Sequence, residues 1–124
     1  MVTYKELWQA QIIKKIEKVE KEKYVSFHKD NYKIDLESAE TFLELSNSKY
    51  AVIAGYYTVL NVTLWNFAKY FNLKISEKNT GVHTNCLIVL DEFVKDAKLI
   101  RKAMACMRRR VETPNNLFYC MINC

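Results

Sequence analysis

The sequence is poor in the residues that form tight turns, with two glycines and one proline among 124 residues. Such a composition excludes a fold that depends on many tight turns. Half of the residues are apolar and 27% are charged, which is typical of a globular domain and not of a disordered chain. The length fits one domain over residues 1–124 with a single hydrophobic core.

Long apolar runs are also missing. No uninterrupted apolar segment reaches the ~20 residues that a membrane-spanning helix needs. The first residues lead directly into charged ones, without the pattern of a secretory signal. We therefore expect a protein that does not enter a membrane and that resides in the cytoplasm.

The four cysteines lack the spacing of a metal site. No C-x-x-C pair occurs, and no histidine follows His83, so zinc-ligand patterns are absent. Asp91 and Glu92 are adjacent and diverge on a helix, and no glycine-rich phosphate loop is present. We expect no metal and no cofactor. The cysteines have apolar neighbours, which favours buried thiols over redox or metal-binding roles: Cys86, Cys106, Cys120 and Cys124.

Hydrophobic periodicity predicts an all-α fold, an up-and-down bundle of four to five helices with a short C-terminal helix. In residues 4–24, Trp8, Ile12, Ile16 and Val19 recur at helical spacing, and a polar loop with His28 is expected to follow. The other expected helices run from Asp35 to about 46, from Lys49 to Lys74, from a cap at Thr84 or Asn85 onward, over 96–111, and over 116–124.

Positive charge is concentrated in one segment. The chain carries a net charge of +5, whereas residues 95–110 alone hold seven basic residues against Asp96. On a helix six of these basic residues, all but Arg110, share one face, which suits contacts to phosphate groups. A solvated helix end is the alternative, because cations favour a helix C-terminus. The residues expected to contact nucleic acid are Arg101, Lys102, Arg108, Arg109 and Arg110.

Residues 39–90 resemble the HEPN superfamily (higher eukaryotes and prokaryotes nucleotide-binding domain). The resemblance rests on A-x-x-F-L from Ala39, on Lys49–Tyr50–Ala51, on Ala54–Gly55–Tyr56–Tyr57, and on a Thr-Gly-x-His sequence that ends at His83. It implies a helical bundle that forms a homodimer. Many members act on RNA, and many are paired with a minimal nucleotidyltransferase in toxin–antitoxin systems.

The resemblance also implies a test for ribonuclease activity. Active members carry an arginine followed four to six residues later by a histidine. Here Arg108, Arg109 and Arg110 lie in the corresponding region, and no histidine follows them. The group that would serve as general acid or base is missing. We therefore expect a domain without catalysis of its own.

The sequence leaves three functions open. The first is a homodimer that binds RNA or a nucleotide through the basic helix face. The second is a protein-interaction module that pairs with a nucleotidyltransferase. The third is a metal-independent ribonuclease with a rearranged site that uses His83. Tyr56, Tyr57 and His83 are possible ligand contacts, although adjacent tyrosines on an apolar helix are more often one core ring and one interface ring.

Overall fold

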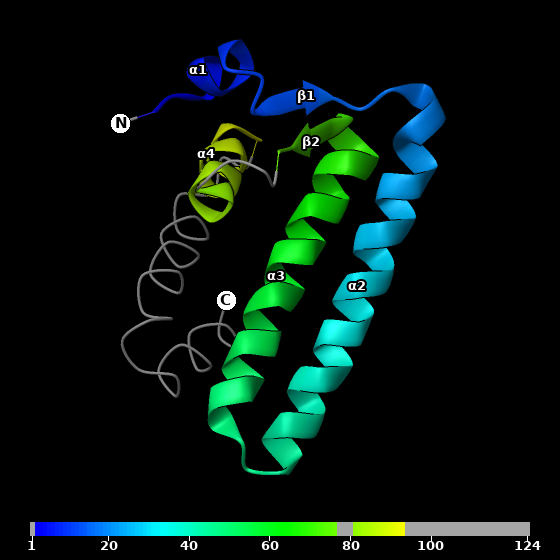
Figure 1. Ribbon diagram of the computed structural model, residues 1–124, viewed down its shortest axis with the longest axis vertical. Coiled ribbons are helices and arrows are strands. Elements are labelled where there is room, and N and C mark those ends of the chain that lie inside the picture. Colours follow the sequence, from blue (N-terminus) through cyan, green and yellow to red (C-terminus); the bar gives the residue numbers. More distant parts are fainter. Residues whose placement is uncertain (1, 77–80, 94–124) are drawn as a thin grey trace.

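The computed structural model describes residues 2–76 and 81–93. The described chain is mainly helical with one small sheet, which confirms the predicted all-α bundle. Figure 1 shows the two long helices side by side along the length of the molecule. The elements, in chain order, are α1 (Tyr4–Gln9), β1 (Ile13–Lys15), α2 (Lys18–Glu44), α3 (Ser48–Phe71), β2 (Leu73–Ile75) and α4 (Val82–Phe93).

Helices α2 and α3 form an antiparallel hairpin. They contain 27 and 24 residues, so at 1.5 Å per residue each extends for roughly 36–40 Å. The chain reverses at Ser46, which has a φ of 57°, and the side chain of Asn47 caps α3 by accepting a hydrogen bond from the amide of Tyr50. The predicted end of a helix near residue 46 and the predicted long central helix are both confirmed.

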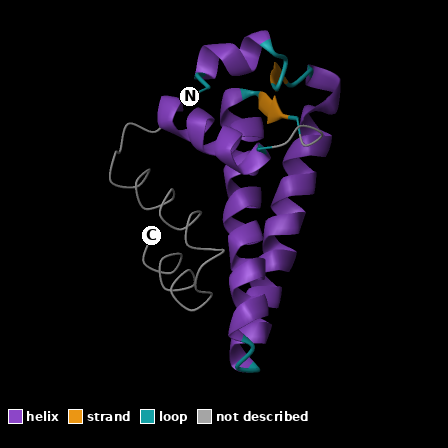
Figure 2. Cartoon of the chain, turned by 60° about the vertical axis from the view of Figure 1, so that its left-hand side comes forward, coloured by secondary structure: helices purple, strands orange, loops and turns teal. Residues whose placement is uncertain are grey.

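A two-stranded antiparallel sheet closes one end of this hairpin (Figure 2). In its register, Ile13 faces Ile75, Lys14 faces Lys74, and Lys15 faces Leu73. Further backbone hydrogen bonds extend the pairing beyond the strands on both sides. Helix α3 ends immediately before β2, because Asn72 adopts a left-handed conformation that an asparagine tolerates well. The sheet thereby ties the N-terminal segment to the end of α3.

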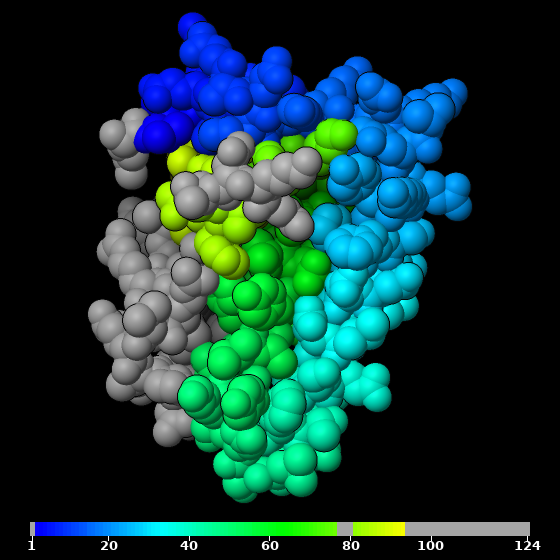
Figure 3. Space-filling model, viewed as in Figure 1, coloured from blue at the N-terminus to red at the C-terminus, as the bar shows by residue number. Residues whose placement is uncertain are grey.

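The main core lies where α1, the sheet, the end of α3 and α4 meet. Figure 3 shows the N-terminal segment covering this end of the molecule, above α4. Cys86 belongs to this core, as predicted for a buried thiol, and the other three cysteines lie outside the described residues. The buried side chains of the core are Leu7, Ile13, Leu64, Phe67, Leu73, Ile75, Cys86 and Val89.

The prediction of one helix over residues 4–24 is wrong. Helix α1 ends at Gln9, and Gln11 has a φ of 58°, which breaks the helix before β1. Ile16 is 4% exposed whereas Val19 is 91% exposed, so the expected apolar stripe does not exist as one face. The strand forms because residues 73–75, some 60 positions later, supply its hydrogen-bonding partner.

Several predicted element boundaries are also wrong. No loop separates residues 28–31 from a second helix at Asp35, since α2 runs through both positions. His28 was expected in a loop, yet it is only 6% exposed. Helix α4 begins at Val82, before the expected caps Thr84 and Asn85. In the described segments no helix combines the length and apolar character that a membrane crossing requires.

Candidate functional site

Two lysines face each other across the sheet. Lys14 on β1 and Lys74 on β2 are register partners, and side chains at such positions have Cβ atoms about 5 Å apart on one face. Like charges directly opposite each other destabilise a strand pair. Within the part of the chain that the structure describes, only Lys74 has an acidic partner, because its Nζ donates to Oε1 of Glu20 at 2.6 Å.

The ion pair between Lys74 and Glu20 shifts the pKa of both groups. The hydrogen bond from Lys74, with help from the backbone amide of Glu17, lowers the pKa of the Glu20 carboxyl below its ordinary value of 4.5. The same bond raises the pKa of Lys74 above 10.5, and partial burial opposes this shift. Both side chains remain partly exposed, so solvent can reach the pair.

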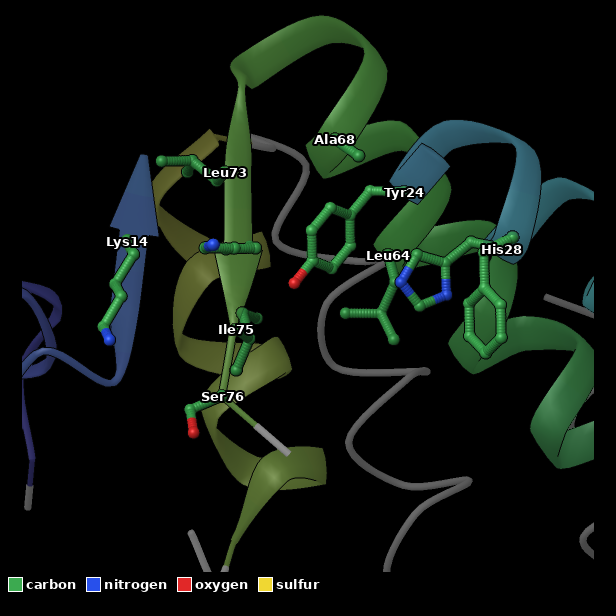
Figure 4. A pocket seen from close by; sticks show the side chains of 10 residues that line it. Lys14, Tyr24, His28, Leu64, Ala68, Leu73, Ile75 and Ser76 are labelled. Carbon is green, nitrogen blue, oxygen red and sulfur yellow. The ribbon is translucent and has the colours of Figure 1, made fainter. Parts of the chain in front are cut away.

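A cavity of about 390 Å³ borders the two lysines (Figure 4). This volume lies in the range typical of small-molecule sites. The sheet contributes one wall, and the first turns of α2 and the last turns of α3 contribute the others. The lining residues are Lys14, Tyr24, Phe27, His28, Leu64, Ala68, Leu73, Lys74, Ile75 and Ser76.

Aromatic rings from α2 form one side of the cavity. Tyr24 and His28 are four residues apart and therefore share a helix face, where their rings stack with centroids 6.5 Å apart at 29°. Phe27 meets the His28 ring edge-on at 5.2 Å. The Nζ of Lys74 lies 5.2 Å from the centre of the Tyr24 ring. Cationic and aromatic groups thus meet at one side of the cavity.

A chain of hydrogen bonds leads from His28 away from the cavity. Nδ1 of His28 lies 3.1 Å from Oδ1 of Asn61, and Nδ2 of Asn61 donates to Oδ2 of Asp35 at 2.9 Å. Nδ2 also donates to the backbone carbonyl of Tyr57 at 3.1 Å. These bonds join α2 to α3, and they satisfy polar groups that would otherwise be costly to bury.

Tyr56 contacts both of the other sequence-predicted ligand contacts, since the Tyr57 ring meets its ring edge-on at 5.7 Å. The Tyr56 hydroxyl and Nδ1 of His83 are hydrogen-bonded, and their ring centroids are 5.1 Å apart, which connects α3 to α4. Tyr56 is 8% exposed and Tyr57 is 45% exposed, so one ring packs inside and its neighbour faces outward. These three residues are not among those lining the cavity. The other predicted contacts lie outside the described residues: Arg101, Lys102, Arg108, Arg109 and Arg110.

No family model, curated protein or solved structure matches this chain. Over residues 2–76 and 81–93, histidine, cysteine and carboxylate side chains do not gather in groups of three or more that could hold a metal ion. The features that bear on function are therefore the geometry of the cavity and its charged groups.

Sequence reasoning missed the residues of this cavity. Lys14 and Lys74 are separated by 60 positions, and only the register of the sheet makes them neighbours. His28 is predicted in a polar loop because residues 28–31 are mostly charged or polar. The available signal was the four-residue spacing of Tyr24 and His28, which on a continuous helix places two rings on one face.

Proposed function

We propose that this domain binds a nucleotide or a short RNA through its phosphate groups, in the cavity between the sheet and the α2–α3 hairpin. The observation that carries the proposal is the pair of lysines placed opposite each other at the cavity wall. Glu20 balances only one of the two cations among the described residues, and like charges placed opposite each other on one face are costly in the unliganded protein. A phosphate between them removes that repulsion and adds charge-assisted hydrogen bonds.

Glu20 does not prevent such a ligand from binding. Its ion pair with Lys74 is partly exposed to solvent, and pairs of this kind are weak. A phosphate offers Lys74 more acceptor oxygens than one carboxylate, and it engages Lys14 at the same time. The carboxylate of Glu20 then returns to water, where it is well solvated.

The remaining lining residues suit the other parts of a nucleotide. Tyr24 and Phe27 offer aromatic surfaces to a base, and base–aromatic stacking contributes about 1–3 kcal/mol per base. The hydroxyl of Ser76 adds a donor near the lysines. The basic segment 95–110 supplies further positive charge, which would extend binding from a nucleotide to an RNA strand.

The test measures binding of adenosine monophosphate and of a short single-stranded RNA by titration calorimetry. Lys74→Ala and Lys14→Ala should each weaken binding about tenfold, because each removes a charged hydrogen bond to phosphate. Lys49→Ala is the matched control, since Lys49 is exposed at the opposite end of α3 and does not line the cavity. Equal loss in all three variants, or no binding by the unaltered protein, would contradict the proposal.

A protein contact is a second candidate, favoured by an exposed apolar stripe on α3. Tyr50, Ile53 and Tyr57 lie at helical spacing on one face and are 50%, 43% and 45% exposed. A symmetric homodimer places the same patch of both subunits face to face, and an uncharged stripe allows this without repulsion between like charges. The partner we assign to it is a second copy of this chain.

A further inference from the structure

His28 is a buried polar side chain whose orientation is fixed by its neighbours. It is 6% exposed, it lies against the rings of Tyr24 and Phe27, and it also lines the cavity. A histidine held in this way has its two ring nitrogens in different surroundings. Their roles follow from the orientation of Asn61.

The amide of Asn61 can be assigned without ambiguity. Its nitrogen side lies against the backbone carbonyl of Tyr57, which only accepts hydrogen bonds, and against the carboxylate of Asp35. The nitrogen must therefore be on that side, and Oδ1 must face His28. Because an amide oxygen only accepts, Nδ1 of His28 is the donor. In the neutral imidazole the other nitrogen, Nε2, then carries no proton and accepts.

The accepting nitrogen is directed to the cavity. Figure 4 shows the imidazole on the α2 side with one ring nitrogen turned toward the space between Tyr24 and Leu64. Nδ1 is held by Asn61, and no described residue donates a hydrogen bond to Nε2. The ring as a whole is nearly buried, but Nε2 is not among the fully buried polar atoms and stays accessible from the cavity. A ligand that fills the cavity must therefore bring a donor to Nε2 or leave this acceptor unsatisfied.

We infer that Nε2 of His28 is the specificity-determining acceptor of this site and that it selects ligands with a hydroxyl or amino donor. This inference rests on the proposed binding of nucleotides. A nucleotide offers both donors, the 2′-hydroxyl of its ribose and the amino group of its base. Asn61 and Asp35 are positioning residues, since they act on the ligand only by holding the proton on Nδ1 of His28.

The first test needs neither a ligand nor a variant. Nitrogen NMR of the imidazole in the unaltered protein, at a pH where His28 is neutral, should show a protonated Nδ1 and an unprotonated Nε2. The opposite tautomer would overturn the inference.

One variant extends this test to a positioning residue. Asn61→Leu should shift the population toward the other tautomer, because it removes the acceptor of the Nδ1 proton.

The second test uses ligands. It compares the binding of three nucleotides to the unaltered protein and to His28→Phe, which keeps an aromatic ring and removes the acceptor. Adenosine monophosphate should bind about tenfold more tightly than its 2′-deoxy analogue if the donor is the sugar hydroxyl, or than inosine monophosphate if it is the amino group. His28→Phe should abolish this preference and should weaken the binding of adenosine monophosphate by the same factor.

The outcomes separate this inference from the proposed function. Equal binding of all three nucleotides, or a preference that persists in His28→Phe, overturns the role of His28 while leaving the lysine site in place. Adenosine monophosphate binding that is insensitive to Lys74→Ala contradicts the proposed function itself. A changed tautomer in Asn61→Leu without loss of fold is a result that a purely structural role would not produce.

Discussion

At the scale of single residues, the cavity combines groups that serve stability with groups that serve binding. Lys74 does both, because it donates to Glu20 in the unliganded protein and borders the proposed phosphate position. Asn61 uses its whole amide to connect two helices and to orient His28. A change at either residue should therefore alter both the free energy of unfolding and the affinity for the ligand, and the two effects can be measured separately.

Removal of the Glu20 carboxylate should strengthen phosphate binding while it weakens the fold. In Glu20→Gln, Lys74 no longer shares its charge with a carboxylate, so affinity for adenosine monophosphate should rise about two- to fivefold at low salt. Glu22→Gln is the control, since it removes the same charge from an exposed position on α2. Weaker binding in Glu20→Gln would mean that the phosphate does not approach Lys74.

The pH dependence of stability follows from the same pair. The pKa of Glu20 is lowered on folding, so its contribution is present above its unfolded value and is lost as pH falls through the folded one. The pKa of Lys74 is raised, so its contribution is complete below its unfolded value and is lost as pH rises through the folded one. Denaturant unfolding across pH should show a smaller loss at acid pH in Glu20→Gln than in Glu22→Gln.

At the scale of elements, the long helix α3 was predictable because its length and apolar character leave no other structure. The end of the hairpin at residues 45–47 was predictable for a similar local reason, since polar residues with turn and capping preferences gather there. Local signals failed at Ile13–Lys15, where the strand depends on a partner 60 residues away. They failed again at His28, which is buried and whose hydrogen-bond partner, Asn61, belongs to the other long helix.

The boundary between α1, β1 and α2 gives a direct test at this scale. Ile16→Ala should lower the free energy of unfolding by about 2–4 kcal/mol, because Ile16 is 4% exposed and its loss leaves a cavity. Val19→Ala should change it by less than about 0.5 kcal/mol, because Val19 is 91% exposed. Urea denaturation of both variants measures the difference. Similar losses of stability in both variants would contradict this boundary and would favour the single amphipathic helix predicted from the sequence.

At the scale of the whole molecule, the two proposed surfaces lie at different places. The cavity lies beside the sheet, at the end of α3, whereas the apolar stripe of Tyr50, Ile53 and Tyr57 begins at the start of that helix. A dimer formed through the stripe would leave the cavity open. Two identical cavities in one dimer would let an RNA strand contact both subunits and would increase its avidity.

A charge introduced into the stripe should prevent dimer formation. Ile53→Glu would bury a carboxylate in the proposed interface, so light scattering coupled to size-exclusion chromatography should report a monomer where the unaltered protein is a dimer. Ile34→Glu is the matched control, since Ile34 is 61% exposed and belongs to α2, not to the helix that carries the stripe. A dimer that survives Ile53→Glu, or a monomeric unaltered protein, would exclude this role for the stripe.

The central claim is that the cavity binds the phosphate of a nucleotide, and NMR titration of the isotope-labelled domain with adenosine monophosphate tests it most directly. We expect saturable shifts concentrated at the cavity, at Lys14, Tyr24, His28, Lys74 and Ser76, that weaken at higher salt. Lys74→Ala should reduce them and Lys49→Ala should not. Shifts confined to other parts of the chain, or none at all, would contradict the claim.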